Sequence, residues 1–251
     1  MRKSEAITVW CDESSVEVVG EKYHLIGTLI TNSDTEELII LDELIKARKR
    51  TGCWNVLHGN ELKSSAVGRM SLIKEWVGVF NGNKIYFHVF MYKEDRTFAV
   101  SGFERYFAKQ SAFSLGCKMK KNGYTIETIF SNVGTVKFLF DRRTGDIESG
   151  LDSEYKKEIK EQLRNRSGRS DDLTVRFSFL SSECFDLMQL CDVFLYAVKV
   201  RIEKENGIPV SDNNKGLLKI WESNFLNNQV RALSDFKYDE KFNFFRSNSG
   251  D

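Results

Sequence analysis

Four acidic residues of this chain stand where a carboxylate could do chemistry: Asp12, Glu61, Asp141 and Asp192. Asp12 and Asp141 each come at the C-terminal end of a short apolar run that is typical of a strand. Glu61 stands just ahead of an expected helix. Asp192 is the only charged residue between positions 187 and 198, in a helical apolar pattern, so we expect its side chain to point into the protein.

A buried carboxylate destabilises a fold unless a cation or a set of hydrogen bonds neutralises it. Mg²⁺ and Mn²⁺ prefer oxygen ligands, and two such ions about 3.5–4 Å apart can activate a water molecule and stabilise a leaving oxygen. Together the acids therefore suit a phosphoryl-transfer site that holds Mg²⁺ or Mn²⁺ as a pair of ions. Taken singly, Asp12 could merely begin a turn, and Asp192 could be a structural residue bonded to nearby backbone or to Tyr196.

Four further side chains could support such a site: Lys63, Arg142, Arg143 and Gln189. Lys63 follows the second acid by two residues and could contact a phosphate or pair with an acid. Arg142 and Arg143 directly follow the third acid and could clamp a phosphate oxygen. Gln189 precedes the last acid by one helical turn and could orient it or bind the substrate. Each charged side chain of this set could equally be an ordinary solvated residue.

Alternating strands and helices are needed to position these residues. We expect strands at residues 7–14, 23–31, 84–92, 136–141 and 173–180, the first two joined as an antiparallel hairpin by a turn at 16–20. Helices are expected from a cap at Ser33 or Asp34 to Gly52, and at residues 65–80, 96–121, 150–166, 183–205 and 215–233. An aromatic tail at 236–245 could pack back on the protein or cap a groove.

The same pattern predicts which side chains are buried. The apolar stripe of the first helix is Leu38, Leu41, Leu44 and Ile45, and that of the second is Val67, Met70, Ile73, Trp76, Val77 and Phe80. The strand at 84–92 is bulky on both faces, so we expect a central strand in which His88 is a packed histidine. Cys184 and Cys191 are expected to be small core residues. The basic residues 46–50 suit either the dipole of the first helix or a phosphate-binding surface.

The composition limits which classes of protein this chain can belong to. A chain of 251 residues with 41% apolar residues can form one domain with a substantial core. The formal net charge of +1 neither requires nor excludes a nucleic-acid partner. Five cysteines without paired spacing suit a reducing cytoplasm, and the scattered histidines do not suggest zinc. We expect neither a signal peptide nor a membrane span, because no apolar run has the required length.

The acids lie in four motifs: Asp12-Glu13-Ser14, Glu61-Leu62-Lys63, Phe140-Asp141-Arg142 and Gln189-Leu190-Cys191-Asp192. In order and spacing these motifs resemble an uncharacterised microbial family, domain of unknown function 3800, over residues 7–201. The resemblance implies an α/β fold with a ribonuclease H-like mixed β-sheet flanked by α-helices and a nuclease-like site made by the four acids. Ser15 replaces a usual glycine and Cys191 a usual alanine, which leaves every carboxylate in place. Residues 206–251 would add a C-terminal helical extension and the aromatic tail.

The leading hypothesis is therefore a divalent-metal-dependent nuclease, a hydrolase that cleaves phosphodiester bonds in RNA, DNA or a hybrid. Basic runs at 46–50, 118–121 and 164–169 could contact phosphates without reading sequence. The alternative is a non-catalytic, ribonuclease H-like adaptor that binds nucleic acid or protein. A phosphatase with Asp12 as nucleophile ranks last, because Ser14 stands where that chemistry normally has a second aspartate. Glu13 is not counted as a ligand, because strand alternation turns it away from Asp12.

Overall fold

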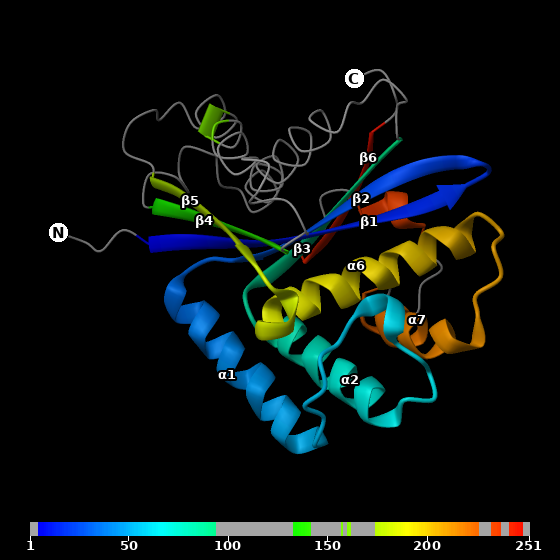
Figure 1. Ribbon diagram of the computed structural model, residues 1–251, viewed down its shortest axis with the longest axis horizontal. Coiled ribbons are helices and arrows are strands. Elements are labelled where there is room, and N and C mark those ends of the chain that lie inside the picture. Colours follow the sequence, from blue (N-terminus) through cyan, green and yellow to red (C-terminus); the bar gives the residue numbers. More distant parts are fainter. Residues whose placement is uncertain are drawn as a thin grey trace.

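The computed structural model describes residues 5–93, 133–141, 174–225, 232–236 and 241–247, with three further residues at 157, 160 and 161. Within them, six strands form one mixed sheet in the order β5-β4-β1-β2-β3-β6 (Figure 1). The strands are β1 (Glu5–Val18), β2 (Glu21–Thr31), β3 (Ile85–Lys93), β4 (Val133–Asp141), β5 (Thr174–Leu180) and β6 (Phe242–Ser247). This arrangement confirms the α/β class and a single mixed sheet among the described residues.

Strands β1 and β2 form the expected antiparallel hairpin. Val19 and Gly20 connect them with φ angles of 52° and 75°, the left-handed conformations typical of a two-residue hairpin turn. The first strand is longer than predicted, because Val16 and Val18 continue the alternation and are buried in the core. Asp12 therefore lies inside β1, and the prediction that it ends the strand is wrong.

The rest of the sheet combines two directions. Strand β3 is antiparallel to β2, whereas β4 is parallel to β1 and β5 is parallel to β4. Every side chain from Ile85 to Tyr92 is buried, which confirms β3 as a central strand, and His88 is fully enclosed there as a packed residue. The edge of the sheet beyond β3 is occupied by β6, which runs parallel to it.

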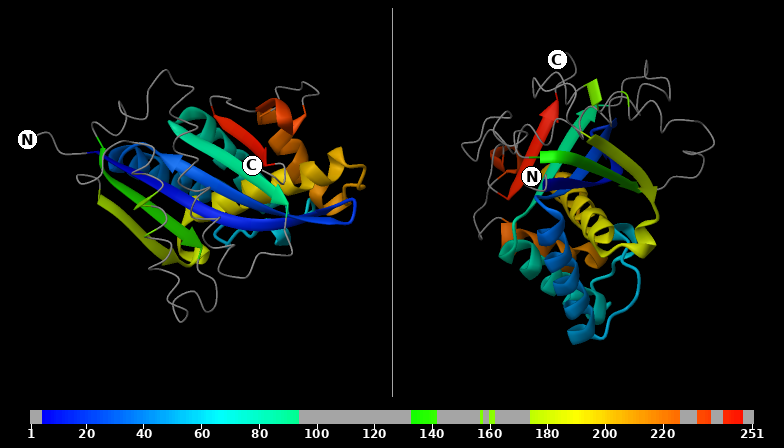
Figure 2. Two further views of the ribbon diagram at one scale, coloured as in Figure 1. Left: turned by 90° about the horizontal axis from the view of Figure 1, so that it is seen from above. Right: turned by 90° about the vertical axis from the view of Figure 1, so that its left-hand side faces the viewer.

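Four helices lie on one face of this sheet (Figures 1 and 2): α1 (Asp34–Thr51), α2 (Val67–Gly82), α6 (Asp186–Glu205) and α7 (Asp212–Phe225). Single 3₁₀ turns are present at η1 (Gly59–Glu61), η2 (Ser182–Cys184) and η3 (Leu233–Phe236). Phe194 of α6 joins the layers, since its ring centroid lies 5.1 Å from that of Phe80 in α2 and 5.4 Å from that of Phe87 in β3. None of the described helices is long and apolar enough to cross a membrane.

Helix α1 begins and ends as its sequence indicates. The Ser33 hydroxyl accepts a hydrogen bond from the backbone N–H of Glu36 at 3.2 Å, so Ser33 is the N-cap. Gly52 ends the helix in a left-handed conformation with φ 66°. Both boundaries confirm the prediction.

The buried face of α1 is the predicted one only in part: Leu44 is buried and Leu41 is partly buried against the core. Leu38 and Ile45 are 67% and 42% exposed, and the buried stripe consists of Ile40, Leu44, Ala47 and Arg48. The pattern of apolar residues alone did not reveal this stripe, because one of its members is an arginine. Arg48 is buried because its guanidinium donates hydrogen bonds to Asp186 and Gln189 of α6. These bonds turn the Arg48 side of α1 towards α6.

Two other predictions are wrong. Val67 is 74% exposed because it is the first residue of α2, although the other members of its stripe are buried. Cys184 is exposed because it lies in η2, ahead of the start of α6 at Asp186. The aromatic tail packs back on the protein, which is one of its two expected outcomes, and it does so by supplying β6, which extends the sheet.

Several predicted segments lie outside the described residues. The helix expected at 96–121 is among them, and the helix expected at 150–166 is described only at residues 157, 160 and 161, which are helical. Two of the three basic runs, at 118–121 and 164–169, also lie outside.

Candidate carboxylate site

Strands β1 and β4 bring two of the predicted acids side by side. Cys11 pairs with Phe140 in the parallel register of the two strands, so the next positions along them are Asp12 and Asp141. Trp10 and Leu139 are the pair that precedes Cys11 and Phe140 in this register, and both pack in the core between the sheet and the helices. Because side chains alternate between faces, Asp12 and Asp141 point to that same helical face.

Helix α6 carries the third acid to this point. The Cys191 thiol lies 3.6 Å from the backbone oxygen of Trp10, so the helix crosses β1 at the position of the two strand acids. Gly27 pairs with Asp12 across the hairpin. A Cβ atom at Gly27 would stand 3.2 Å from Leu195 of α6 and 3.3 Å from Phe87, so glycine permits the close approach of helix and sheet.

The three carboxylates Asp12, Asp141 and Asp192, which we name the carboxylate cluster, affect one another electrostatically. Burial raises the pKa of Asp12 well above its ordinary value, and the negative charges of Asp192 and Asp141 raise it further. Burial also raises the pKa of Asp192, as does the charge of Asp141. The sequence-predicted acids of β1, β4 and α6 therefore converge on one face of the sheet.

The connection between α1 and α2 contacts this cluster through two residues that sequence reasoning did not select. The backbone N–H of Gly59 donates to Asp192 Oδ2 at 3.1 Å, and His58 Nδ1 lies 3.6 Å from the same oxygen. Both contacts favour the ionised form of Asp192 and oppose the effect of burial on its pKa. A Cβ atom at Gly59 would stand 2.3 Å from Cβ of Tyr196, so the connection can lie against α6 only with glycine there.

The remaining predicted residues are placed differently. Glu61 and Lys63 are exposed, in η1 and just after it, on the same connection as Gly59. Arg142 and Arg143 lie outside the described residues. Within the described part of the chain, no three of the histidine, cysteine, aspartate and glutamate side chains form a ready-made group of metal ligands.

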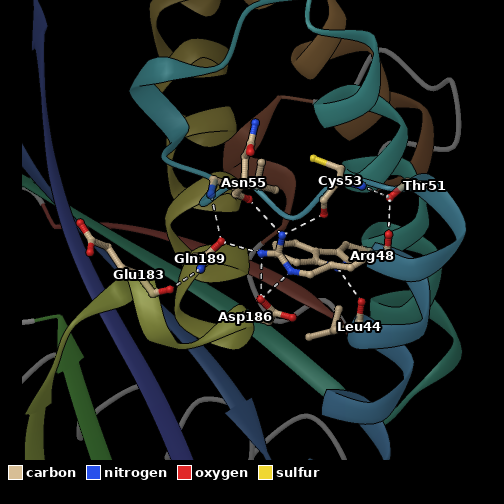
Figure 3. Close-up of polar contacts among 10 residues, drawn as sticks. Leu44, Arg48, Thr51, Cys53, Asn55, Glu183, Asp186 and Gln189 are labelled. Carbon is tan, nitrogen blue, oxygen red and sulfur yellow. Dashed lines mark hydrogen bonds and ion pairs between the residues drawn. The ribbon is translucent and has the colours of Figure 1, made fainter.

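Gln189 is part of a second polar cluster, drawn in Figure 3, that we name the Arg48 cluster: Arg48, Asp186 and Gln189. Arg48 Nη2 donates to Gln189 Oε1 at 2.9 Å, and Arg48 Nε donates to Asp186 Oδ1 at 2.9 Å. Gln189 Oε1 also accepts from the backbone N–H of Leu57 at 2.9 Å, while its Nε2 donates to the backbone oxygen of Glu183 at 3.2 Å. Gln189 thus holds the connection between α1 and α2 against α6.

Arg48 completes this attachment with backbone contacts. Its Nη1 donates to the carbonyl oxygens of Cys53 and Asn55 at 3.1 and 3.0 Å (Figure 3). Its guanidinium carbon lies 4.9 Å from the centroid of the Trp76 ring, which covers it from the α2 side. Arg48 and Gln189 together therefore fix the segment 53–57, from which His58 and Gly59 lead to Asp192.

Two other basic residues at the end of α1, Lys46 and Arg50, also have acidic partners. Lys46 Nζ lies 2.6 Å from Asp42, and Arg50 Nη2 lies 2.6 Å from Glu75 of α2. Both pairs are exposed, and the contact with Asp42 raises the pKa of Lys46. The basic run at 46–50 is thus largely engaged within the protein, and Arg48 is its buried member.

The donors of the carboxylate cluster fit a divalent cation. Its acids present hard oxygen ligands, which Mg²⁺ and Mn²⁺ prefer over nitrogen or sulfur. A cation bound among these carboxylates would offset the cost of burying Asp12 and Asp192 and their repulsion by Asp141. The fit rests on this donor chemistry, since the described side chains do not close a ligand group by themselves.

No sequence signal marked Arg48 or His58 as special. Arg48 is one of four basic residues within positions 46–50, and His58 stands alone in a polar connection. Gly59 offered the best available signal, because a glycine in a connection can mark a close approach of the backbone. Comparisons of the chain with protein-family models, with curated proteins and with solved structures found no match.

Proposed function

We propose that this chain is a Mg²⁺- or Mn²⁺-dependent nuclease of the ribonuclease H-like class, which hydrolyses phosphodiester bonds in nucleic acid. The observation that carries the proposal is the convergence of Asp12, Asp141 and Asp192 on one face of the sheet. Acids from two neighbouring parallel strands and a crossing helix have no structural need to gather in a partly buried place. A site in which these carboxylates bind a divalent ion would account for their gathering.

The topology supports the ribonuclease H-like assignment. Strands β1, β2 and β3 are consecutive and antiparallel, and β4 and β5 are added in parallel on the β1 side. A mixed sheet with flanking helices that carries these acids is what the ribonuclease H-like resemblance implies.

The residues take the following roles in the proposal. Asp12, Asp141 and Asp192 hold the metal, and Glu61 joins them from the connection that already contacts Asp192. When bound, the divalent ion supplies an activated water and the positive charge that stabilises the leaving oxygen. Lys63, Arg142 and Arg143 contact substrate phosphates. Gln189 acts indirectly, because its side chain holds the connection to α6.

The test is a hydrolysis assay with labelled single-stranded RNA, single-stranded DNA and an RNA–DNA hybrid, in Mg²⁺, in Mn²⁺ and in EDTA. We expect cleavage of at least one substrate only with a divalent ion, and we expect Asp12→Asn and Asp192→Asn to abolish it. Asp42→Asn is the matched control, since Asp42 is exposed on α1 and pairs only locally with Lys46. Metal-dependent cleavage that survives in Asp12→Asn or Asp192→Asn would mean that the site is elsewhere.

A second candidate function is a binding adaptor of the same fold that performs no chemistry. The absence of a closed ligand group among the described residues favours it. Calorimetric titration of the protein with Mg²⁺ and Mn²⁺ separates the two candidates. An adaptor binds neither ion, and in it Asp12→Asn raises thermal stability without any other consequence.

A further inference from the structure

A cavity of about 430 Å³ opens next to the Arg48 cluster, between α1, the segment that follows α1 and the start of α6. Its volume is within the range of sites that bind small organic groups. The apolar part of its lining includes Ile45, Trp54 and Phe185, and the polar part includes Glu183 and Asp186. Such a lining combines a flat apolar wall with a few polar groups that can orient a ligand.

Trp54 distinguishes this cavity from an ordinary surface depression. The chain has four tryptophans, of which Trp10, Trp76 and Trp221 are each 2% exposed or less, whereas Trp54 is 60% exposed. An exposed indole ring beside a cavity is a platform on which a planar ring can stack, and nucleobases use such platforms in proteins that bind single strands.

The hydrogen-bonding groups around the cavity are mainly acceptors. The guanidinium of Arg48 is already engaged by Asp186, Gln189 and backbone carbonyls, so it is not available to a ligand as a donor. Among the described residues, Arg48 contacts only Oδ1 of Asp186, which leaves Oδ2 able to accept. Glu183 is exposed and adds a second carboxylate to the lining. A ligand that donates hydrogen bonds is therefore preferred.

The cavity and the carboxylate cluster share the same two segments. Asp186 stands six positions before Asp192 on α6, which corresponds to about 9 Å along the helix axis. The connection between α1 and α2 likewise leads from Trp54 at the cavity to Gly59 at Asp192.

We propose that this cavity binds a nucleobase of the substrate strand, stacked on Trp54 and hydrogen-bonded to the carboxylates of Asp186 and Glu183. With the carboxylates at position 4 of the pyrimidine ring it prefers cytosine to uracil, because the amino group of cytosine donates there and the oxygen of uracil would meet another acceptor. The assignment deepens the proposed nuclease function and rests on it for the identity of the ligand.

The experiment is a titration of the protein in EDTA with CMP and with UMP, followed by tryptophan fluorescence. The two nucleotides differ at the base position that the carboxylates would contact. We expect saturable quenching by CMP, with a Kd at least about five-fold lower than that for UMP. Because Trp54 is the exposed tryptophan, Trp54→Phe should lose the quenching and keep CMP affinity in calorimetry, whereas Trp54→Ala should weaken that affinity about ten-fold.

Equal affinities for CMP and UMP, no binding of either, or quenching that persists in Trp54→Phe would overturn the assignment. Asp212→Asn should bind CMP as the wild type does, since Asp212 is exposed on α7, pairs with Lys215 and does not line the cavity. CMP binding by a protein that cleaves no nucleic acid in Mg²⁺ would support the cavity and reject the nuclease. Cleavage of nucleic acid without CMP binding would contradict the nucleobase site and would still support the nuclease function.

Discussion

The Arg48 cluster and the carboxylate cluster lie close together along α6, and they contain opposite arrangements of charge. In the first, a buried guanidinium meets the carboxylate of Asp186, the amide of Gln189 and two backbone carbonyls. In the second, like charges gather, and burial raises the pKa of both Asp12 and Asp192. A balanced cluster stabilises the structure that contains it, whereas a cluster of like charges is a candidate for function.

The two clusters are joined by the connection between α1 and α2. Arg48 and Gln189 hold its residues 53–57, and the next two residues contact Asp192. The balanced cluster thus positions the backbone that faces the unbalanced one. Their different charge arrangements predict different responses to mutation, to pH and to metal.

The largest effect is expected from removal of the buried guanidinium. Arg48→Met leaves Asp186 and the carbonyls of Cys53 and Asn55 without their donor, so we expect it to lower the free energy of unfolding by about 3–5 kcal/mol. Arg50→Met removes an arginine from the same helix that pairs with Glu75 in solvent, and should cost about 1 kcal/mol or less. Urea denaturation followed by circular dichroism measures both. Equal losses would show that Arg48 is not the organising residue.

A divalent ion should act on the carboxylate cluster alone. At an ion concentration of 100 times its Kd, we expect Mn²⁺ to raise the free energy of unfolding of the wild type by about 2.7 kcal/mol. The gain should be lost in Asp12→Asn and retained in the control Asp42→Asn. Thermal unfolding with and without EDTA tests this. An equal gain in Asp12→Asn would place the ion at another site.

The pH dependence of the metal-free protein follows from the same cluster. Because the pKa of Asp12 is raised in the folded state, that state holds the proton more tightly than the unfolded chain does. Stability should therefore fall as pH rises from the ordinary aspartate pKa through the raised one. The fall should be smaller in Asp12→Asn, which in EDTA at neutral pH should be more stable than the wild type. A parallel fall in the variant would assign the effect to other groups.

The contact between the connection and α6 should give a smaller effect. Gly59→Ala places a methyl group 2.3 Å from Cβ of Tyr196, and we expect a loss of about 1–3 kcal/mol in the free energy of unfolding. Gly68→Ala is the matched control, because nothing lies within 4 Å of its Cβ position in α2. That change should be neutral or stabilising by up to about 1 kcal/mol. Similar results for the two variants would contradict the close approach at Gly59.

Local patterns predicted much of the fold. The hairpin, the Ser33 cap, the Gly52 end and the buried strand β3 were all readable, because each depends on residues near one another in the sequence. The place of Arg48 on the buried face of α1 was not readable, because Arg48 meets its partner Asp186 across a separation of 138 residues. A pair of residues so far apart in the sequence produces no periodic pattern of apolar residues. The role of the tail as a sheet strand escaped prediction for the same reason.

The candidate site was predictable in part. Acids near strand ends and an isolated acid in an apolar helix were visible, and three of them, Asp12, Asp141 and Asp192, lie together in the structure. The residues that position them were not visible, because His58 and Gly59 act by contact with a helix far along the chain. Gln189 was selected for its position one turn from Asp192, and its contacts hold the connection to α6.

Strand β6 has a consequence for how the protein folds. It pairs with β3, from a distant part of the sequence, and its Phe242 stacks on Phe87 at 5.9 Å between ring centroids. Contacts between residues so far apart form late and slowly. Until they form, the apolar strand β3 presents an open edge, on which a second chain could pair. Chaperone dependence or aggregation during synthesis should therefore be governed by the arrival of β6, although this strand carries none of the proposed catalytic residues.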